Sequence, residues 1–182
     1  MKKITFITGN DGKAAELSRL LGIPLNHRKI DIDEIQELDL EKLIKHKALL
    51  AFDKVKSPIL VEDTSLTFEA LGKIPGPFIK WFLKEIGNIG LCRMLNSFDS
   101  RKAIFTTMFA YYDGKELKIF RKSTSGSIAN VPRGNNGFGW DALFIPKGST
   151  KTRGEMTHAE QDFYTARKPL IPELKVFFHN NF

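Results

Sequence analysis

One stretch, Ile59–Leu66, restricts the choice of fold more than any other part of the sequence, because in it a β-branched apolar run meets two adjacent carboxylates. A continuous apolar run is typical of a strand that is covered on both faces, and the ligands of such sheets collect beyond the strand ends. We therefore expect a buried strand that ends at Glu62 and Asp63 and presents both acids for chemistry. The alternative is a strand followed by an ordinary turn that Asp63 caps.

The length and composition indicate one ordinary domain, because 182 residues with 42% hydrophobic content are enough to bury a core. The apolar run Ile4–Ile7 is too short for a secretory signal, and nowhere do eighteen apolar residues follow one another. We therefore expect a cytoplasmic protein that does not enter membranes. Cys92 is the only cysteine, which excludes an internal disulfide and a cysteine-based zinc cluster.

The charge is unevenly distributed along the chain. The net charge is +7, yet residues 31–41 contain six acids and no base. A basic protein with one acidic segment suits an anionic ligand that arrives with a divalent cation, but it also suits nucleic acid or a solvated acidic loop. Charge alone does not choose among these three interpretations.

The N-terminal residues predict a phosphate-binding loop. Ile4–Thr8 is typical of a first strand, and the polar residues 9–12 lead into a helix with an apolar face. Free backbone N–H groups, the positive end of the helix and Lys13 would all favour an anion at this loop. A plain Gly-Asn turn without a ligand would leave the same pattern.

A second helix is predicted over residues 39–55, where apolar side chains recur with helical spacing. Lys47 falls inside this apolar stripe. Its stem would lie along the buried face, while its ammonium must reach either an anion in a cavity or the solvent at the edge of the core. The sequence leaves both alternatives open.

The middle of the chain predicts a rigid turn, two helices and a hairpin. The turn covers residues 72–77, and the first helix is expected to bury Phe78, Trp81, Phe82 and Ile86. A further helix is expected at residues 88–97. The runs 103–112 and 116–121, joined at Asp113-Gly114, then predict a β-hairpin in a second, antiparallel lobe.

Residues 132–141 combine Phe138 and Trp140 with several glycines. Because glycine weakens packing, we expect these rings to form a flat platform that a planar ligand approaches closely. Stacking of a base on an aromatic ring contributes about 1–3 kcal/mol. The alternative is a structural turn with one buried tryptophan. The remaining residues, 155–178, predict helices that Pro169 and Pro172 interrupt.

Taken in order, these motifs resemble the inosine triphosphate pyrophosphatase family, which hydrolyses non-standard nucleoside triphosphates. The resemblance runs from about residue 4 to residue 178 and is most specific in the combination of two blocks, residues 61–64 and 138–141. The other matching motifs are Thr8-Gly9-Asn10 with Lys13, Gly72–Pro77, Arg133-Gly134 and Glu155-Met156. The resemblance implies one domain over residues 1–182, with an elongated, two-lobed α/β fold. A mixed central β-sheet would be flanked by helices, with a nucleotide cleft between the lobes.

The resemblance also implies roles for individual residues. Catalysis would depend on Asp63, Lys13 and Lys47, with Asp63 orienting or deprotonating the attacking water. Magnesium, or manganese in its place, would be held by Glu34, Glu62 and Asp63, and the division of metal binding and base chemistry between Glu62 and Asp63 stays open. The substrate would be bound by Thr8, Asn10, Lys13, Lys47, Phe138, Gly139, Trp140, Asp141, Gln161, Thr165 and Arg167.

The implied reaction is attack of water at the α-phosphorus of ITP, XTP and their deoxy forms, which releases pyrophosphate and cleanses the nucleotide pool. Two alternatives stay open: a Maf-like nucleotide pyrophosphatase that prefers other bases, and a non-catalytic nucleotide or RNA-binding protein. Carboxylates beside phosphates repel unless a metal intervenes, which argues against pure binding. The resemblance further implies a homodimer, and we expect no stable nucleic-acid partner.

The sequence departs from the family pattern near its C-terminal end. Where relatives carry lysine after Ala-Glu, and then Ser-His-Arg, this chain has Gln161 and Thr165-Ala166-Arg167. Lysine and arginine only donate hydrogen bonds and so favour a 6-oxo purine, whereas glutamine, if its amide is free to flip, both donates and accepts. We expect base recognition to depend on Arg167 and to be less selective than in relatives. The alternative is that a neighbouring residue or water replaces the missing donors.

Overall fold

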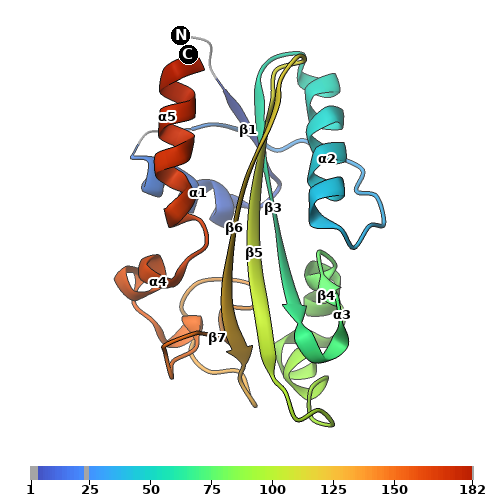
Figure 1. Cartoon of the computed structure of the whole chain (residues 1–182), viewed down its shortest axis with the longest axis vertical. Coiled ribbons are helices and arrows are strands. Elements are labelled where there is room, and N and C mark those ends of the chain that lie inside the picture. The colour runs from blue at the N-terminus through green and yellow to red at the C-terminus, as the bar shows by residue number, and fades with distance from the viewer. Residues whose placement is uncertain (1–3, 23–24, 182) are drawn as a thin grey trace. The chain divides into compact units, whose positions relative to one another are not determined.

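The protein is described here from a computed structural model that covers residues 4–22 and 25–181 and contains two compact units. The first unit takes in the chain up to Asp63, Thr107–Lys122 and the chain from Arg167 onward. The second unit takes in Thr64–Thr106 and Ser123–Ala166. Three of the four divisions between the units fall within long strands, and the fourth falls between Ala166 and Arg167 (Figure 1).

A mixed, open β-sheet forms the centre of the fold, which confirms the predicted α/β class. The strand order is β2-β1-β3-β5-β6-β7, with β4 paired to β3. β1 lies parallel to both β2 and β3, whereas the β3–β4 and β6–β7 pairs are antiparallel. The strands are β1 (Thr5–Ile7), β2 (Asn26–Arg28), β3 (Ile59–Phe68), β4 (Pro75–Gly76), β5 (Lys102–Tyr112), β6 (Leu117–Ile128) and β7 (Phe144–Pro146).

Capping side chains start the helices that begin at Asp11, Leu40 and His158. The Asn10 side chain accepts a hydrogen bond from the Lys13 N–H at the start of α1, and Gly22 ends that helix with a φ of 70°. The α-helices are α1 (Asp11–Leu21), α2 (Leu40–Val55), α3 (Ile79–Arg93), α4 (His158–Tyr164) and α5 (Ile171–Asn181). Short 3₁₀ turns are η1 (Glu69–Leu71), η2 (Arg153–Glu155) and η3 (Lys168–Leu170). Within the described ranges, no helix is both long and apolar enough to cross a membrane.

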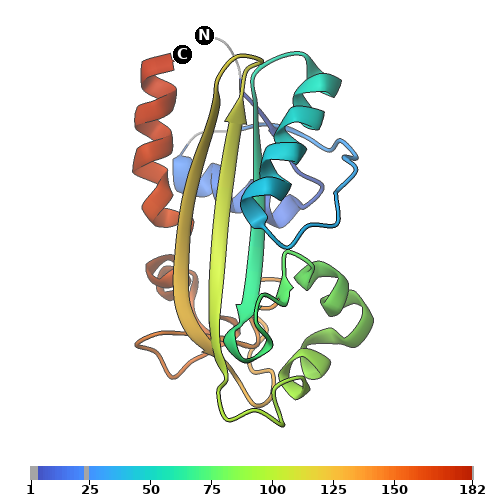
Figure 2. The same ribbon diagram turned by 45° about the vertical axis from the view of Figure 1, so that its right-hand side comes forward.

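In the first unit, helices cover both faces of the sheet because neighbouring strand residues point to opposite sides. Phe6 packs in a cluster with residues of α1 and α5, whereas Ile7 packs in a cluster with residues of α2. Figures 1 and 2 show α1 and α5 on one side of β1 and β3 and α2 on the other. A strand buried on both faces is what the apolar run Ile59–Val61 predicted, and all three of its residues are 0% exposed.

The expected end of β3 at the two acids is wrong. β3 continues to Phe68, so Glu62 and Asp63 are its fourth and fifth residues and no turn follows them. The strand continues because Leu66 and Phe68 are buried in the second unit's core, and because Leu66 and Thr67 pair with β4. What ends near the acids is the neighbouring strand, since Ile7 of β1 pairs with Val61 and the β1 strand stops there.

The hairpin of β5 and β6 is as predicted, with Asp113 accepting hydrogen bonds from the N–H groups of Lys115 and Glu116, both at 2.8 Å. Its assignment to a separate second lobe is wrong in part, because Thr107–Lys122 belongs to the first unit. The second unit has its own core, in which α3 packs against β3, the start of β5 and residues 143–144.

The prediction that the aromatic residues of α3 are buried is also wrong in part. Trp81 and Ile86 are 53% and 44% exposed, whereas Phe82 packs partly against the core of the second unit. The two helices expected here form one element with a kink at Gly87, whose φ of 64° and ψ of −177° are not helical. The residues of α3 that are buried are Ile79, Leu91 and Cys92.

Candidate active site

The candidate site of the first unit forms where β1 ends beside β3. After Ile7, β1 turns through residues 8–10 into α1, while β3 continues into Glu62 and Asp63. Beyond Val61, therefore, β3 has passed the end of its parallel partner, and α1 begins there instead. The carboxyl end of a parallel strand next to a helix N-terminus is where α/β proteins bind ligands.

Glu62 is the most buried charge of this site, with its side chain 0% exposed. Its Oε1 atom accepts hydrogen bonds from Arg167 Nε at 2.9 Å and Arg167 Nη2 at 2.6 Å. Lys13 Nζ lies 3.8 Å from the same oxygen. Within the part of the chain that the structure describes, Oε2 is buried and has no hydrogen-bond partner. Glu62 therefore has one saturated oxygen and one oxygen able to accept a ligand.

Arg167 also donates from Nη1 to Glu16 Oε2 at 2.6 Å, and sequence reasoning missed Glu16. A signal was present: Glu16 follows Lys13 by three residues and precedes the buried Leu17, so it lies near the inward face of α1. Arg167 was expected to read the purine base. The structure instead places its guanidinium, on a residue only 3% exposed, between two carboxylates of the first unit.

The Lys47 ammonium contacts carboxylates. Of the two alternatives for this residue, an anion or the solvent at the edge of the core, the structure therefore shows the anion. Its Nζ atom donates to Glu34 Oε1 and to Asp63 Oδ2, both at 2.9 Å, and its side chain is 14% exposed. Burial acts to lower the pKa of Lys47, but the nearby carboxylates of Asp63 and Glu34 outweigh it and raise the pKa above its ordinary value. Lys47 is therefore a permanent cation beside Asp63.

The pKa of Lys13 is shifted in the opposite direction. Burial lowers its pKa from the ordinary value, although the carboxylates of Glu62 and Asp63 act to raise it. The two predicted loop residues before it have structural tasks: the Thr8 hydroxyl accepts from the Asn10 N–H at 3.1 Å, and Asn10 Oδ1 accepts from the Lys13 N–H at 3.1 Å. The loop is thus ordered before any ligand binds.

The acidic segment 31–41 does not act as one acidic pocket. Only Glu34 is joined to the site, through Lys47. Asp39 caps α2, Glu37 accepts from the Asp39 N–H at 2.9 Å, and Glu41 pairs with Lys45 at 2.6 Å. Most of this charge therefore stabilises the start of α2, as expected for acids at a helix N-terminus.

The carboxylates of this site suit a divalent metal only if a substrate supplies further ligands. In the residues that the structure describes, no group of three or more acidic, histidine or cysteine side chains is close enough together to hold an ion. Magnesium is usually held by only one or two carboxylates together with substrate phosphates, and the open Oε2 of Glu62 suits that mode. Within the described residues, the ion pairs of the site also join four carboxylates to three cations, an excess of negative charge that would repel a triphosphate without a metal.

In the second unit, Phe138 and Trp140 are not equivalent. Phe138 is 40% exposed, which suits a stacking surface. Trp140 packs partly against the core and makes an edge contact with Phe105, with ring centroids 5.8 Å apart. The expectation of two matched platform rings is therefore wrong for Trp140, for which the alternative of a structural tryptophan fits better.

The glycines of this loop are explained by contacts within the protein. A Cβ on Gly134 would lie 2.1 Å from Gly154 O, and one on Gly137 would lie 2.2 Å from Asp141 Oδ2. Gly139 instead needs its φ of 64°, because a Cβ there would meet nothing closer than 3.9 Å. Close approach by a planar ligand is not needed to explain these residues.

The residues expected to read the base near the C-terminus are buried. Gln161 is 7% exposed and its Nε2 donates to Arg153 O at 2.7 Å, so the expected freedom of this amide to flip is wrong. Thr165 is 3% exposed, and Ala166 is 0% exposed in the core of the second unit. A histidine at position 166 would overpack that core.

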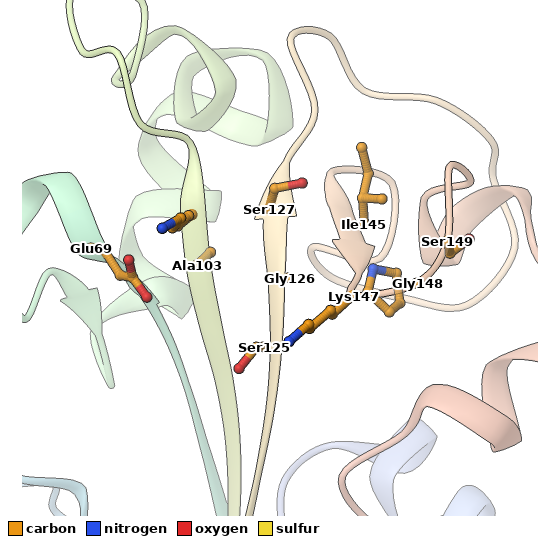
Figure 3. Close-up of a pocket in the computed structure, with 11 residues that line it drawn as sticks. Glu69, Ala103, Ser125, Gly126, Ser127, Ile145, Lys147, Gly148 and Ser149 are labelled. Atoms are coloured by element: carbon orange, nitrogen blue, oxygen red, sulfur yellow. The ribbon is translucent and has the colours of Figure 1, made fainter.

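A separate pocket of about 440 Å³ lies over the β5, β6 and β7 edge of the second unit (Figure 3). Lys102, Lys147 and three serines line it, and Figure 3 shows the Lys147 side chain pointing toward Ser125. None of the predicted nucleotide-binding residues lines this pocket. It is therefore not the predicted nucleotide site.

Comparison with known proteins gives consistent matches over nearly the whole chain. The family model described as the Ham1 family matches residues 4–175. The chain is 41% identical over 180 residues to inosine triphosphate pyrophosphatase 2 of Trypanosoma cruzi, covering 97% of this chain and 92% of the relative. It is 40% identical over 179 residues to inosine triphosphate pyrophosphatase of Yarrowia lipolytica, covering 96% and 94%.

Solved structures share the fold. A nucleoside-triphosphatase, described as a dITP/XTP pyrophosphatase, from Mycobacterium abscessus matches with a TM-score of 0.76 and 27% identity, over 94% of this chain and 98% of that chain. A HAM1 protein from Coxiella burnetii matches with a TM-score of 0.84 and 25% identity, over 99% and 100%. Both agree with the mixed sheet described above.

Proposed function

The chain belongs to the Ham1 family, and we propose that it hydrolyses non-standard purine nucleoside triphosphates to monophosphate and pyrophosphate. The relatives named above are inosine triphosphate and dITP/XTP pyrophosphatases, so ITP, XTP and their deoxy forms are the proposed substrates. Removing them would cleanse the nucleotide pool.

The observation that supports this proposal most is the pair of adjacent acids on β3 with a different cation on each. Glu62 accepts from Arg167 and faces Lys13, whereas Asp63 accepts from Lys47. A binding-only protein would gain nothing from carboxylates at this position, because they repel phosphate. A hydrolase needs them to hold a metal and to take up a proton.

The proposed step is a hydrolysis at the α-phosphorus. A water oxygen forms a bond to the α-phosphorus, and the bond from that phosphorus to the oxygen bridging to the β-phosphorus breaks. Asp63 accepts the proton of the water, and pyrophosphate leaves with the bridging oxygen. Lys47 donates a hydrogen bond to Asp63 and holds its carboxylate in place, and Lys13 offsets charge that develops on the phosphates.

We propose that magnesium, or manganese in its place, would be held by one or two of the carboxylates of Glu62, Asp63 and Glu34 together with the substrate phosphates. The support is the open Oε2 of Glu62 and the all-oxygen chemistry of these side chains. When bound, the ion would neutralise charge on the triphosphate, which the carboxylates alone would repel.

Incubating the protein with ITP and assaying pyrophosphate, with magnesium and with the chelator EDTA, tests the proposal. Pyrophosphate that forms only with the metal is the expected result. Orthophosphate in place of pyrophosphate would contradict the proposed bond cleavage. Tight ITP binding without any product would favour a nucleotide-binding protein instead.

We also propose that the protein is a homodimer. Trp81, Ile86 and Ile89 of α3 are 53%, 44% and 58% exposed, and apolar residues grouped on one helix are typical of an interface. Sedimentation velocity at micromolar concentration should give a dimer for the wild type and a monomer for Ile89→Glu. A monomeric wild type would refute this proposal.

The cytoplasm is the compartment we propose, in agreement with a single cysteine, Cys92, that is free and buried. Fractionation of cells that express a tagged protein should recover it with cytoplasmic markers. Recovery in an organelle or membrane fraction would contradict the assignment.

A further inference from the structure

Arg153 is a buried charge with no part in the proposed reaction. It lies in η2 of the second unit and is 3% exposed. Its Nε atom donates to Asp141 Oδ1 at 2.6 Å, and its Nη1 atom donates to Gln161 O at 3.2 Å. A buried charge needs such partners because desolvation is costly. Arg153 therefore joins the loop before β7 to the helix α4.

Asp141 is fully engaged by this arrangement. Besides the bond from Arg153, its Oδ2 atom accepts from the Phe138 N–H at 3.0 Å, and its backbone carbonyl accepts from the Gly154 N–H at 2.7 Å. Asp141 thus ties the Phe138 backbone to η2. The direction of the exposed Phe138 ring depends on a carboxylate that Arg153 holds.

The Gln161 side chain also lies close to Asp141. The position that a Cβ of Gly137 would occupy lies 2.2 Å from Asp141 Oδ2 and 3.1 Å from Gln161 Nε2. Position 161 carries a neutral amide that donates to Arg153 O, and Arg153 is the cation that holds the Asp141 carboxylate.

We propose that Arg153 is a positioning residue for base recognition, whose positive charge holds the Asp141 carboxylate. It fixes Asp141 and, through it, the loop Gly137–Asp141 that presents Phe138 to the purine. This inference rests on the proposed function, because it assumes a purine nucleotide as the substrate.

The test combines Arg153→Met with a compensating substitution. Arg153→Met should raise the KM for ITP roughly ten- to hundredfold, the equivalent of one lost charge-assisted hydrogen bond, while kcat stays within about twofold. Adding Gln161→Lys should restore the KM to within about threefold of wild type, because a cation again faces Asp141. An unchanged KM in a folded Arg153→Met protein, or no rescue by Gln161→Lys, would overturn the proposal.

Arg101→Met is the matched control, because Arg101 is another arginine of the second unit whose side-chain hydrogen bonds, in the part of the chain that the structure describes, all go to backbone carbonyls. It donates to Cys92 O at 2.7 Å, Ile128 O at 2.8 Å and Ala129 O at 2.9 Å. Its replacement should lower stability without changing the KM for ITP. An equal rise in KM for both variants would show that loss of stability alone weakens binding, and would overturn the proposed role.

A readout that does not depend on activity separates this inference from the proposed function. With Trp81→Phe, Trp140 becomes the only tryptophan, and it lies in the loop in question. Its fluorescence should become more accessible to quenching by acrylamide in Arg153→Met, and protected again once Gln161→Lys is added. If Arg153→Met does not fold, Arg153→Lys takes its place and should show the same effects in smaller measure. Unchanged quenching would overturn the inference, whereas a wild type without pyrophosphatase activity would refute only the proposed function.

Discussion

Replacing Arg167 by methionine tests how the first unit is held together. Its guanidinium joins the C-terminal part of the chain to Glu62 on β3, a residue 105 positions earlier. Methionine keeps most of the side-chain volume but removes the charge and every donor. Glu62, with its side chain 0% exposed, would then keep, among the residues that the structure describes, Lys13 at 3.8 Å as its remaining cation.

The expected loss of stability follows from this burial. Removing one partner of a buried ion pair costs about 3–5 kcal/mol, and the remaining Lys13 places this case at about 3 kcal/mol. Glu16, with its side chain 15% exposed, can be solvated and adds little. For a chain of this length, about 3 kcal/mol corresponds to a fall in Tm of about 6–12 °C.

Urea unfolding, followed by circular dichroism and by fluorescence, measures this effect and checks two-state behaviour. The matched variant is Arg167→Met combined with Glu62→Gln, which removes both charges and should recover most of the lost free energy of unfolding. A single variant within about 1 kcal/mol of wild type would refute the reasoning, since the pair would then behave as an exposed one. A double variant that is no more stable than Arg167→Met would also refute the reasoning.

The remaining predictions concern proton transfer, pH and backbone shape. Asp63→Asn should bind ITP with nearly unchanged affinity in calorimetry but lose turnover, because the amide cannot accept the proton of water; normal turnover would exclude Asp63 as the base. The pKa of Lys13 is lowered from its ordinary value of 10.5, whereas that of Lys47 is raised. As pH rises, Lys13 therefore loses its proton before Lys47 does. Lys13→Arg should therefore shift the alkaline fall in kcat/KM to higher pH, whereas Lys47→Arg should not; the reverse pattern would contradict the assignment. Gly134→Ala should lower the free energy of unfolding in urea by about 3 kcal/mol or more, because its Cβ would lie 2.1 Å from a carbonyl oxygen. Gly148→Ala, also at positive φ but in open space, should lower it by only about 1 kcal/mol. Equal losses for the two variants would refute the steric argument.

The sequence predicted the first unit well because local patterns decide its structure. The β-branched residues Ile59–Val61 form a strand that is buried on both faces, and Lys47, inside an apolar stripe, does reach an anion. The sequence predicted a strand end at Glu62 and Asp63, but the strand that ends there is β1 and not β3. A strand end depends on pairing between distant segments, which periodicity does not reveal.

The second unit shows where sequence reasoning stops. Gly134 and Gly137 read as space for a ligand, but backbone and carboxylate atoms of the same unit fill that space. Arg153 carries no local signal, because its partner Asp141 lies 12 residues away and only folding brings them together. The partners of a buried charge follow from tertiary structure, so neither spacing nor composition could have found this pair.

Hydrolysis of ITP in water enriched in ¹⁸O tests the central claim most directly, because it reports which phosphorus the water attacks. With magnesium present, we expect inosine monophosphate that carries one ¹⁸O atom and pyrophosphate that carries none, and we expect Asp63→Asn to form neither product. Label in orthophosphate, with inosine diphosphate as the other product, would contradict attack at the α-phosphorus and with it the proposed function.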